Sequence, residues 1–185
     1  MRQYASFEVT ELDLLGVLLI QPKVFKDDRG FFAETFRQEA LAAAGITAPF
    51  VQDNLSFSRK NVLRGLHSQK KPHAQAKLVR CASGEIFDVV VDHNVDSPTF
   101  GESVSVTLSG AKQTMLYIPA QYAHGFCVLS DEAIVEYKVD DYYHPECAVG
   151  VRYDDPAFSI AWPVQHPILS EQDKLLKPLS HERVA

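Results

Sequence analysis

The sequence predicts an all-β domain that is built as a sandwich or a barrel. Short runs of β-branched and aromatic residues fill most of the chain, and Gly, Pro, Ser and Asp separate them. Strands do not alternate with long helical patterns, which argues against a parallel βαβ sheet. The length of 185 residues suits a single domain, 1–185, because no linker or repeat marks a boundary.

The predicted strands follow one another in chain order. They lie at residues 17–25, 50–57, 62–69, 77–82, 85–92, 102–108, 114–118, 125–129 and 133–143. Turn residues separate them, as at residues 28–30, 83–84 and 130–131. The alanine-rich residues 35–44 predict a helix that Gly45 ends, and Ser170 predicts the start of a second short helix that ends before Pro178.

Composition narrows the function and the location. The net charge is -6 and the chain has no run of Lys or Arg, so we expect no nucleic-acid surface. The apolar residues 12–20 are too few to span a bilayer and follow Glu11, so we expect no membrane span and no signal peptide. Cys81, Cys127 and Cys147 are odd in number and lack metal-type spacing, which favours reduced core thiols in a cytoplasm.

Three basic residues, Arg64, His67 and Lys77, lie on two neighbouring strand-like runs. Strand alternation can aim all three side chains into one pocket, and Gly65 permits a close approach of backbones there. A cluster of basic groups that faces the interior is costly unless an anion partners it. The cluster therefore predicts a site that holds an anion and abstracts a proton beside an oxyanion.

A metal-dependent site is the first alternative for histidines in a β-barrel. Such sites usually offer a His-x-His pair and a downstream carboxylate. Here Gln69 stands two residues after His67, and Lys77 stands where a carboxylate is needed. Since an ammonium repels a divalent cation and favours an oxyanion, we expect no metal and no cofactor.

Three further residues each have a structural and a functional interpretation. His124 precedes Gly125 in a predicted rim turn, which either delivers it inward or leaves it on the surface. Tyr137 shares a strand face with Val135, as a core residue or as an acid. Asp173 completes a capping-box pattern that starts at Ser170, and spacing alone favours capping over catalysis.

The chain resembles the dTDP-4-dehydrorhamnose 3,5-epimerase family over nearly its whole length and in the right order. The matching segments are Arg29-Gly30-Phe31-Phe32 with Glu34, Gln52-Asp53-Asn54, Leu63-Arg64-Gly65-Leu66-His67, Lys77-Leu78-Val79-Arg80, Gly84-Glu85-Ile86-Phe87-Asp88, Ser97-Pro98-Thr99-Phe100-Gly101, Ala123-His124-Gly125-Phe126, Tyr137-Lys138, Asp155-Pro156, Trp162-Pro163 and Leu169-Ser170. Ser68, Ala76, Ala148 and Gln172 depart from the family pattern, with Gln172 standing where lysine is usual.

This resemblance implies a cupin-type jelly-roll barrel with a few short helices, a metal-free site, and a homodimer in which N-terminal strands are exchanged or shared. It implies the epimerisation of a dTDP-linked 4-keto-6-deoxyhexose at carbons 3 and 5 in dTDP-L-rhamnose synthesis. His67 is then the base, Asp173 orients it, Tyr137 is the acid and Lys77 stabilises the enolate. The implied substrate-binding residues are Arg29, Phe32, Glu34, Gln52, Asp53, Asn54, Arg64, His124, Tyr143 and Gln172.

Other functions stay open at this point. A relative that inverts one carbon, or that acts on another deoxysugar nucleotide, would share most of these motifs, although the presence of Tyr137 disfavours it. A metal-dependent cupin enzyme is a second alternative. A sugar-binding barrel without catalysis is a third, but binding alone requires neither a base nor an opposed acid.

Overall fold

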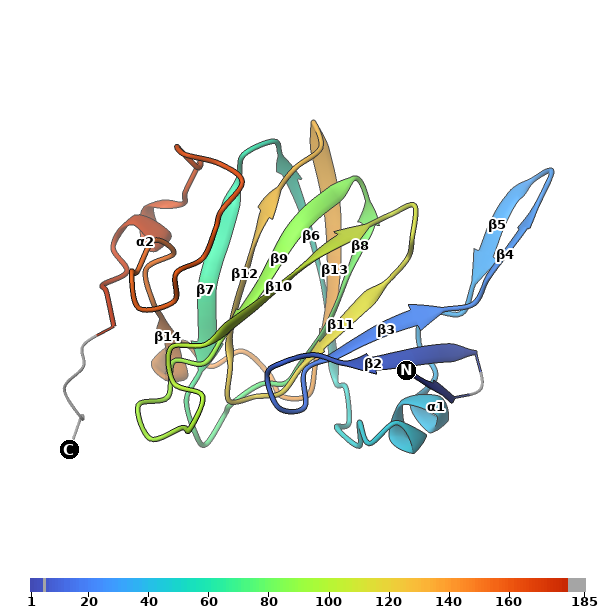
Figure 1. Cartoon of the computed structure of the whole chain (residues 1–185), viewed down its shortest axis with the longest axis horizontal. Coiled ribbons are helices and arrows are strands. Elements are labelled where there is room, and N and C mark those ends of the chain that lie inside the picture. Colours follow the sequence, from blue (N-terminus) through green and yellow to red (C-terminus); the bar gives the residue numbers. More distant parts are fainter. Residues whose placement is uncertain (5, 180–185) are drawn as a thin grey trace.

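The computed structural model describes residues 1–4 and 6–179, and it confirms the all-β prediction (Figure 1). Two antiparallel sheets face each other. One has the strand order β1 (Arg2–Tyr4), β2 (Phe7–Glu11), β3 (Leu18–Pro22), β11 (Met115–Ile118), β8 (Lys77–Ser83), β13 (Glu132–Val139) and β6 (Gln52–Arg59). The other has the order β10 (Ser103–Ser109), β9 (Glu85–Val91), β12 (Ala123–Val128), β7 (Leu63–Gln69) and β14 (Ala148–Gly150).

Three elements lie outside the two sheets. A separate hairpin, β4 (Val24–Asp27) and β5 (Gly30–Ala33), projects from the sandwich as an arm (Figure 1). The helices are short, α1 (Gln38–Ala43) and α2 (Glu171–Lys174), and a 3-10 turn covers Pro145–Cys147. Both helices fall inside the predicted segments.

The predicted strand at 17–25 was wrong in one respect, because the structure divides it into β3 and β4. Lys23 lies between them, and its backbone N–H donates to the Ser6 carbonyl at 2.8 Å, where the chain leaves the main sheet. The predicted strand at 133–143 ends early, at Val139. Asp140 instead accepts a hydrogen bond from the Ala76 N–H at 2.7 Å, which begins a loop.

The main core lies between the sheets. Val79, Cys81 and Val135 from the larger sheet pack in one cluster with Ile86 and Val90 from the smaller one, and all of them are fully or almost fully buried. Tyr137 packs against this cluster, as its shared face with Val135 predicts. A second cluster lies around α1, where Leu41 and Ile46 pack with Ile20 and Phe7 of the N-terminal strands.

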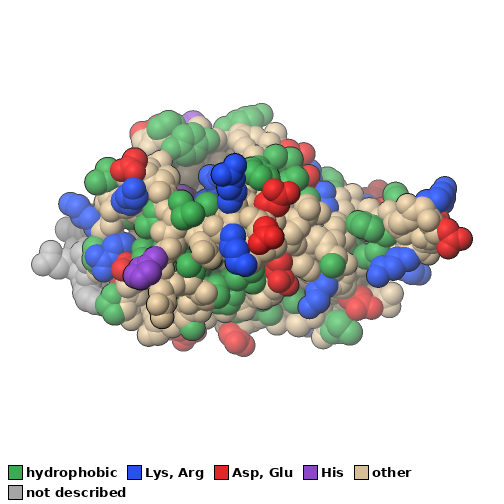
Figure 2. All heavy atoms as spheres, turned by 90° about the horizontal axis from the view of Figure 1, so that it is seen from above, with side chains coloured by type: hydrophobic (Ala, Val, Ile, Leu, Met, Phe, Trp, Pro, Cys, Tyr) green, Lys and Arg blue, Asp and Glu red, His purple; other side chains and the backbone are tan. Residues whose placement is uncertain are grey.

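The surface in Figure 2 is hollowed on one side, and basic and histidine side chains border the hollow. Acidic and basic side chains are interspersed on the rest of this face. Within the described residues, no helix is long and apolar enough to cross a membrane. The three cysteines are buried and free of disulfides, as predicted.

Candidate functional site

A cavity of about 470 Å³ opens between the two sheets, and the three predicted basic side chains line it. Arg64 and His67 come from β7, whereas Lys77 begins β8. These strands belong to opposite sheets, so the two runs face each other across the sandwich and do not pair in one sheet. The Lys77 Nζ spans the gap and donates to the His67 carbonyl at 3.1 Å.

Glycine allows β7 to pack against β12 at this point. Gly65 has φ +119, and a Cβ there would lie 2.6 Å from the Gly125 Cα. A side chain on Gly125 would lie equally close to the Arg64 carbonyl. The register between β7 and β12 shifts between His124 and Phe126, and His124 pairs directly with His67. The close approach predicted for Gly65 is therefore confirmed.

His67 forms a dyad with Asp173. The His67 Nε2 lies 2.5 Å from the Asp173 Oδ1, and the carboxylate is buried while the imidazole is partly exposed to the cavity. Burial alone would raise the pKa of Asp173, but the hydrogen bond and the charge of His67 outweigh it and lower this pKa overall. An ionised Asp173 accepts the Nε2 proton and leaves the Nδ1 lone pair of His67 free to act as a base.

Asp173 also serves the helix that carries it. Ser170 is the N-cap of α2, and its hydroxyl accepts the Asp173 N–H at 3.0 Å. The side chain of Asp173 turns to His67, so only half of the predicted capping box forms. The cap and the dyad therefore coexist, because the backbone N–H of Asp173 serves the cap and its carboxylate serves the dyad.

A second polar group lies beside Lys77. His124 is buried, and its Nε2 lies 3.0 Å from both carboxylate oxygens of Asp88, which is fully buried. His124 occupies the start of strand β12, so the turn predicted at this histidine lies just before it, at residues 119–122. Its side chain faces the cavity, as the first interpretation required.

Burial lowers the pKa of the Lys77 ammonium to about 8, and the charge of Asp88 offsets part of that effect. Since Lys77 must be charged to stabilise an oxyanion, we expect kcat/KM to fall as the pH rises through about 8. Lys77→Arg keeps its charge and should remove this limb from the pH profile, even if it is slower. A limb that stays near pH 8 in that variant would assign the titration to another group.

Tyr137 lies on β13, in the sheet opposite to the sheet of His67. Both residues line the cavity, so a bound molecule would lie between them. Burial raises the pKa of Tyr137, and the nearby charge of Arg64 lowers it in part. The phenol therefore keeps its proton at neutral pH, as an acid must.

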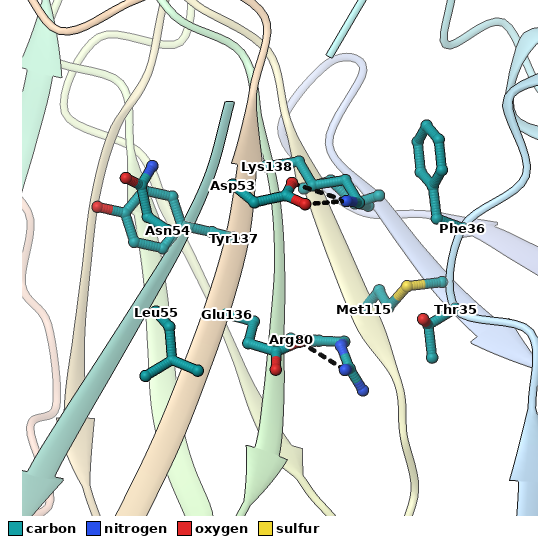
Figure 3. Close-up of a pocket in the computed structure, with 11 residues that line it drawn as sticks. Thr35, Phe36, Asp53, Asn54, Leu55, Arg80, Met115, Glu136, Tyr137 and Lys138 are labelled. Carbon is teal, nitrogen blue, oxygen red and sulfur yellow. Dashed lines mark hydrogen bonds and ion pairs between the residues drawn. The ribbon is translucent and has the colours of Figure 1, made fainter. Parts of the chain in front are cut away.

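Of the remaining predicted residues, two line the cavity and three lie on strand β6. Gln172 and Tyr143 line it. Asn54 pairs with Tyr137 across strands β6 and β13. The side-chain amide of Gln52 donates to the Asn54 side-chain oxygen at 2.8 Å. Asp53 lies on the opposite face of β6, where Lys138 donates to it at 2.7 Å; Figure 3 shows this contact beside the Arg80–Glu136 ion pair. Asp53 therefore lies on the outer face of the sheet, away from the cavity.

The predicted residues of the arm lie away from the cavity of their own chain. Arg29 is exposed at the tip of the hairpin and forms an ion pair with Asp27 at 2.6 Å. Phe32 is 67% exposed on β5. Glu34 follows the arm and accepts a hydrogen bond from Ser6. None of these three is among the described residues that line the cavity.

Some lining residues were not predicted. Ser56 is one of them, and its hydroxyl is the buried side-chain oxygen that lacks a hydrogen-bond partner among the described residues. Strand alternation places Ser56 on the same face as Asn54, so the periodicity of the strand could have predicted that Ser56 lines the cavity. Gln75, Phe126, Val149 and Leu176 also line the cavity. Several of these residues reach the cavity through the folding of loops and of the C-terminal segment, which local sequence patterns do not predict.

A base and an acid on opposite walls can take a proton from one face of a carbon and return one to the other. The antiparallel sandwich and a cavity with titratable groups on both walls fit the class of cupin-type epimerases, which are isomerases.

Comparison with known proteins narrows this class. Residues 11–181 match the family model described as dTDP-4-dehydrorhamnose 3,5-epimerase. The dTDP-4-dehydrorhamnose 3,5-epimerase of Shigella flexneri is 51% identical over 89% of this chain and 92% of its own length. This chain belongs to the dTDP-4-dehydrorhamnose 3,5-epimerase family.

A solved structure agrees with this assignment. The dTDP-6-deoxy-D-glucose-3,5-epimerase of Legionella pneumophila, in complex with dTDP-4-keto-L-rhamnose, has a TM-score of 0.90 and 44% identity, and the match covers 94% of this chain and 93% of that one. A dTDP-4-dehydrorhamnose 3-epimerase of Streptomyces niveus is also similar, at 38% identity over 88% of this chain and 79% of its own length.

Proposed function

We propose that this protein converts dTDP-4-dehydro-6-deoxy-D-glucose to dTDP-4-dehydro-L-rhamnose by inverting carbons 3 and 5, in dTDP-L-rhamnose synthesis. The observation that carries the proposal is the His67–Asp173 dyad on one wall of the cavity, with Tyr137 on the other. The free buried thiols also support a cytoplasmic location.

The substrate ketone at carbon 4 makes the hydrogens on carbons 3 and 5 acidic. The Nδ1 of His67 takes one of these protons, and the electron pair of the broken C–H bond moves to the ketone oxygen. The ammonium of Lys77 and the imidazole of His124 line the same cavity and can stabilise that negative charge. Asp173 stabilises the imidazolium that forms, through its bond to Nε2.

Inversion requires that the new proton arrive on the opposite face. Tyr137 can donate its phenolic proton to the carbon while the electron pair returns from the enolate. Arg64 lies close enough to Tyr137 to lower its pKa, so the same charge helps the phenolate that remains. Exchange with solvent then resets His67 and Tyr137 for the second carbon.

The proposal is tested by turnover in deuterated water. If both carbons are inverted, the product carries solvent deuterium at carbon 3 and at carbon 5, and coupling to the downstream reductase yields dTDP-L-rhamnose. Deuterium and inversion at one carbon only would make this protein a single-carbon epimerase. No exchange at either carbon would remove proton transfer from the proposal.

We also infer a homodimer in which the arm of each chain completes the cavity of the other. The aromatic residues Phe25, Phe31 and Phe32 of the arm are exposed, and so are Leu55 and Phe57 on the outer face of β6. A surface of this kind is typical of a contact with another chain. The predicted substrate-binding residues Arg29 and Phe32 lie on the arm, and neither of them lines the cavity of its own chain.

Mixing two inactive variants tests this arrangement. Arg29→Ala removes the arm cation and His67→Asn removes the base, so each homodimer should be nearly inactive. A mixed dimer would hold one site with an intact base and an intact partner arm, and activity should return after the chains exchange. Leu15→Ser replaces an apolar residue away from the arm that is more exposed than the arm phenylalanines, and as the control it should leave the dimer intact in light scattering. A monomeric wild type, or the absence of complementation, would contradict the shared site.

A further inference from the structure

Two histidines and a carboxylate meet outside the cavity. His73 lies in the loop before β8, whereas Asp141 and His144 lie in the loop after β13. One donor atom from each of the three residues lies within 4.8 Å of the others. A tetrahedral Zn²⁺ with bonds of about 2.1 Å holds its ligand atoms about 3.4 Å apart, which is the separation that the three donor atoms would adopt around an ion.

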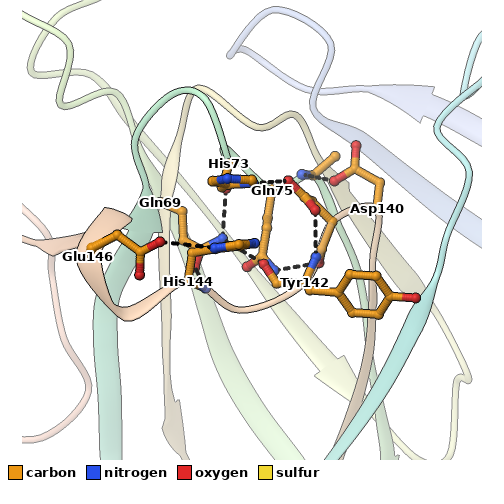
Figure 4. A network of polar contacts seen from close by, with 9 residues as sticks. Gln69, His73, Gln75, Asp140, Tyr142, His144 and Glu146 are labelled. Carbon is orange, nitrogen blue, oxygen red and sulfur yellow. Dashed lines mark hydrogen bonds and ion pairs between the residues drawn. The ribbon is translucent and has the colours of Figure 1, made fainter.

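The imidazole rings already lie close together. The rings of His73 and His144 stack at a centroid distance of 3.4 Å, as Figure 4 shows, and the His73 Nδ1 lies 2.9 Å from the Asp141 Oδ2. The ring planes are almost parallel, at 10°, so one ring must turn before the in-plane lone pairs of both can reach the same ion. Neutral imidazoles next to an ionised carboxylate are the ligand set that Zn²⁺ and related ions prefer.

A second carboxylate supports one of the histidines. The Glu146 Oε1 lies 3.1 Å from the His144 Nδ1, and Figure 4 shows Glu146 pointing at that ring. In the tautomer that donates Nδ1–H to Glu146, the Nε2 of His144 keeps its lone pair. Metal-bound histidines generally donate their other ring N–H to a carboxylate or a carbonyl in this way.

The two loops are also held near each other without an ion. Gln69 donates to the His73 carbonyl at 2.7 Å and accepts the His144 N–H at 2.6 Å, and Gln75 donates to the Asp141 carbonyl at 2.6 Å. These bonds fix the backbone that carries all three candidate ligands. The backbone of the site is therefore ordered in advance, which lowers the entropy that the two loops would lose when an ion binds.

We propose that His73, Asp141 and His144 form a binding site for one transition-metal ion of the Zn²⁺ type, which joins the two loops beside the cavity. The site is separate from the catalytic groups, because none of its three residues lines the cavity. Tyr143, which precedes His144, and Gln75, two residues after His73, do line the cavity, so the ion would tie the two loops together next to the cavity wall. The proton transfers proposed for the cavity do not involve this ion.

Titration calorimetry with ZnCl2 on the untagged, chelator-treated full chain tests the site. We expect one Zn²⁺ per chain, and a rise in Tm of about 5–10 °C when free Zn²⁺ is about 100 times its Kd. His73→Ala/His144→Ala should abolish both effects, and Glu146→Gln should weaken binding about 10–100-fold. His166→Ala, which removes an exposed imidazole elsewhere, should change neither.

Circular dichroism and epimerase activity without Zn²⁺ verify that each variant is folded. Zn²⁺ binding that persists in the double variant would place the ion elsewhere and overturn the proposal, as would a wild type that binds no Zn²⁺. Loss of binding in Asp141→Asn alone, with activity kept, would support the three-ligand set even if the double variant failed to fold.

Discussion

His67→Asn should lower the rate of epimerisation about 10²–10⁴-fold, which is the usual contribution of a positioned general base. Asparagine retains a polar side chain that can still reach Asp173, but it has no basic nitrogen at neutral pH. Exchange of the substrate hydrogens with deuterated water should fall by the same factor, since the first proton can no longer be removed. The measurement is single-turnover exchange followed by NMR, with dTDP binding as the test of an intact site.

Two companion variants separate the roles around the base. Asp173→Asn keeps the backbone N–H that Ser170 caps but removes the charge that stabilises the imidazolium, so its rate should fall strongly. Ser170→Ala removes the cap and retains the dyad, and it should cost stability more than rate. If His67→Asn exchanges hydrogen at the wild-type rate, His67 is not the base.

Tyr137→Phe should separate exchange from inversion. Phenylalanine keeps the ring that packs against the core cluster but has no proton to give. His67 should therefore still remove a proton and return deuterium to the same face, so the substrate gains label with its configuration retained. Formation of the inverted sugar, measured with the downstream reductase, should fall about 10²-fold or more.

The matched control for this variant is Tyr143→Phe. Tyr143 also lines the cavity but is more exposed than Tyr137. The proposed mechanism assigns it no proton transfer. That variant should change KM more than the ratio of inversion to exchange. Inversion of carbon 5 at the wild-type rate in Tyr137→Phe would assign the acid to another group and leave Tyr137 as a packing residue.

Periodicity and turn chemistry predicted most of the fold. The alternation of Val135 and Tyr137 correctly predicted that they share a strand face, and Ser170 correctly predicted the start of α2. The N-terminal strands β1 and β2 escaped prediction, because their short, mixed-charge sequences carry little signal until the rest of the sheet pairs with them. The split at Lys23 depends on a hydrogen bond to Ser6, which is a tertiary contact.

The site was predicted only in part, because tertiary contacts bring its residues together. The residue types of Arg64, His67 and Lys77 indicated one pocket that binds an anion, although the strands that carry them lie in opposite sheets. Spacing alone assigned Asp173 to helix capping, and only the resemblance to a family paired it with His67 across 106 positions of sequence. The burial of Asp88 beside His124 had no local signal at all.

The cavity between the sheets replaces part of the apolar core. In a closed sandwich the space between β7 and β8 would hold interdigitated aliphatic side chains. Here it holds a lysine, an arginine and two histidines, together with the Ser56 hydroxyl, which has no protein partner in the described chain. The sandwich therefore gives up apolar burial at this point, and the free energy that folds the chain must come from the apolar clusters on either side of the cavity.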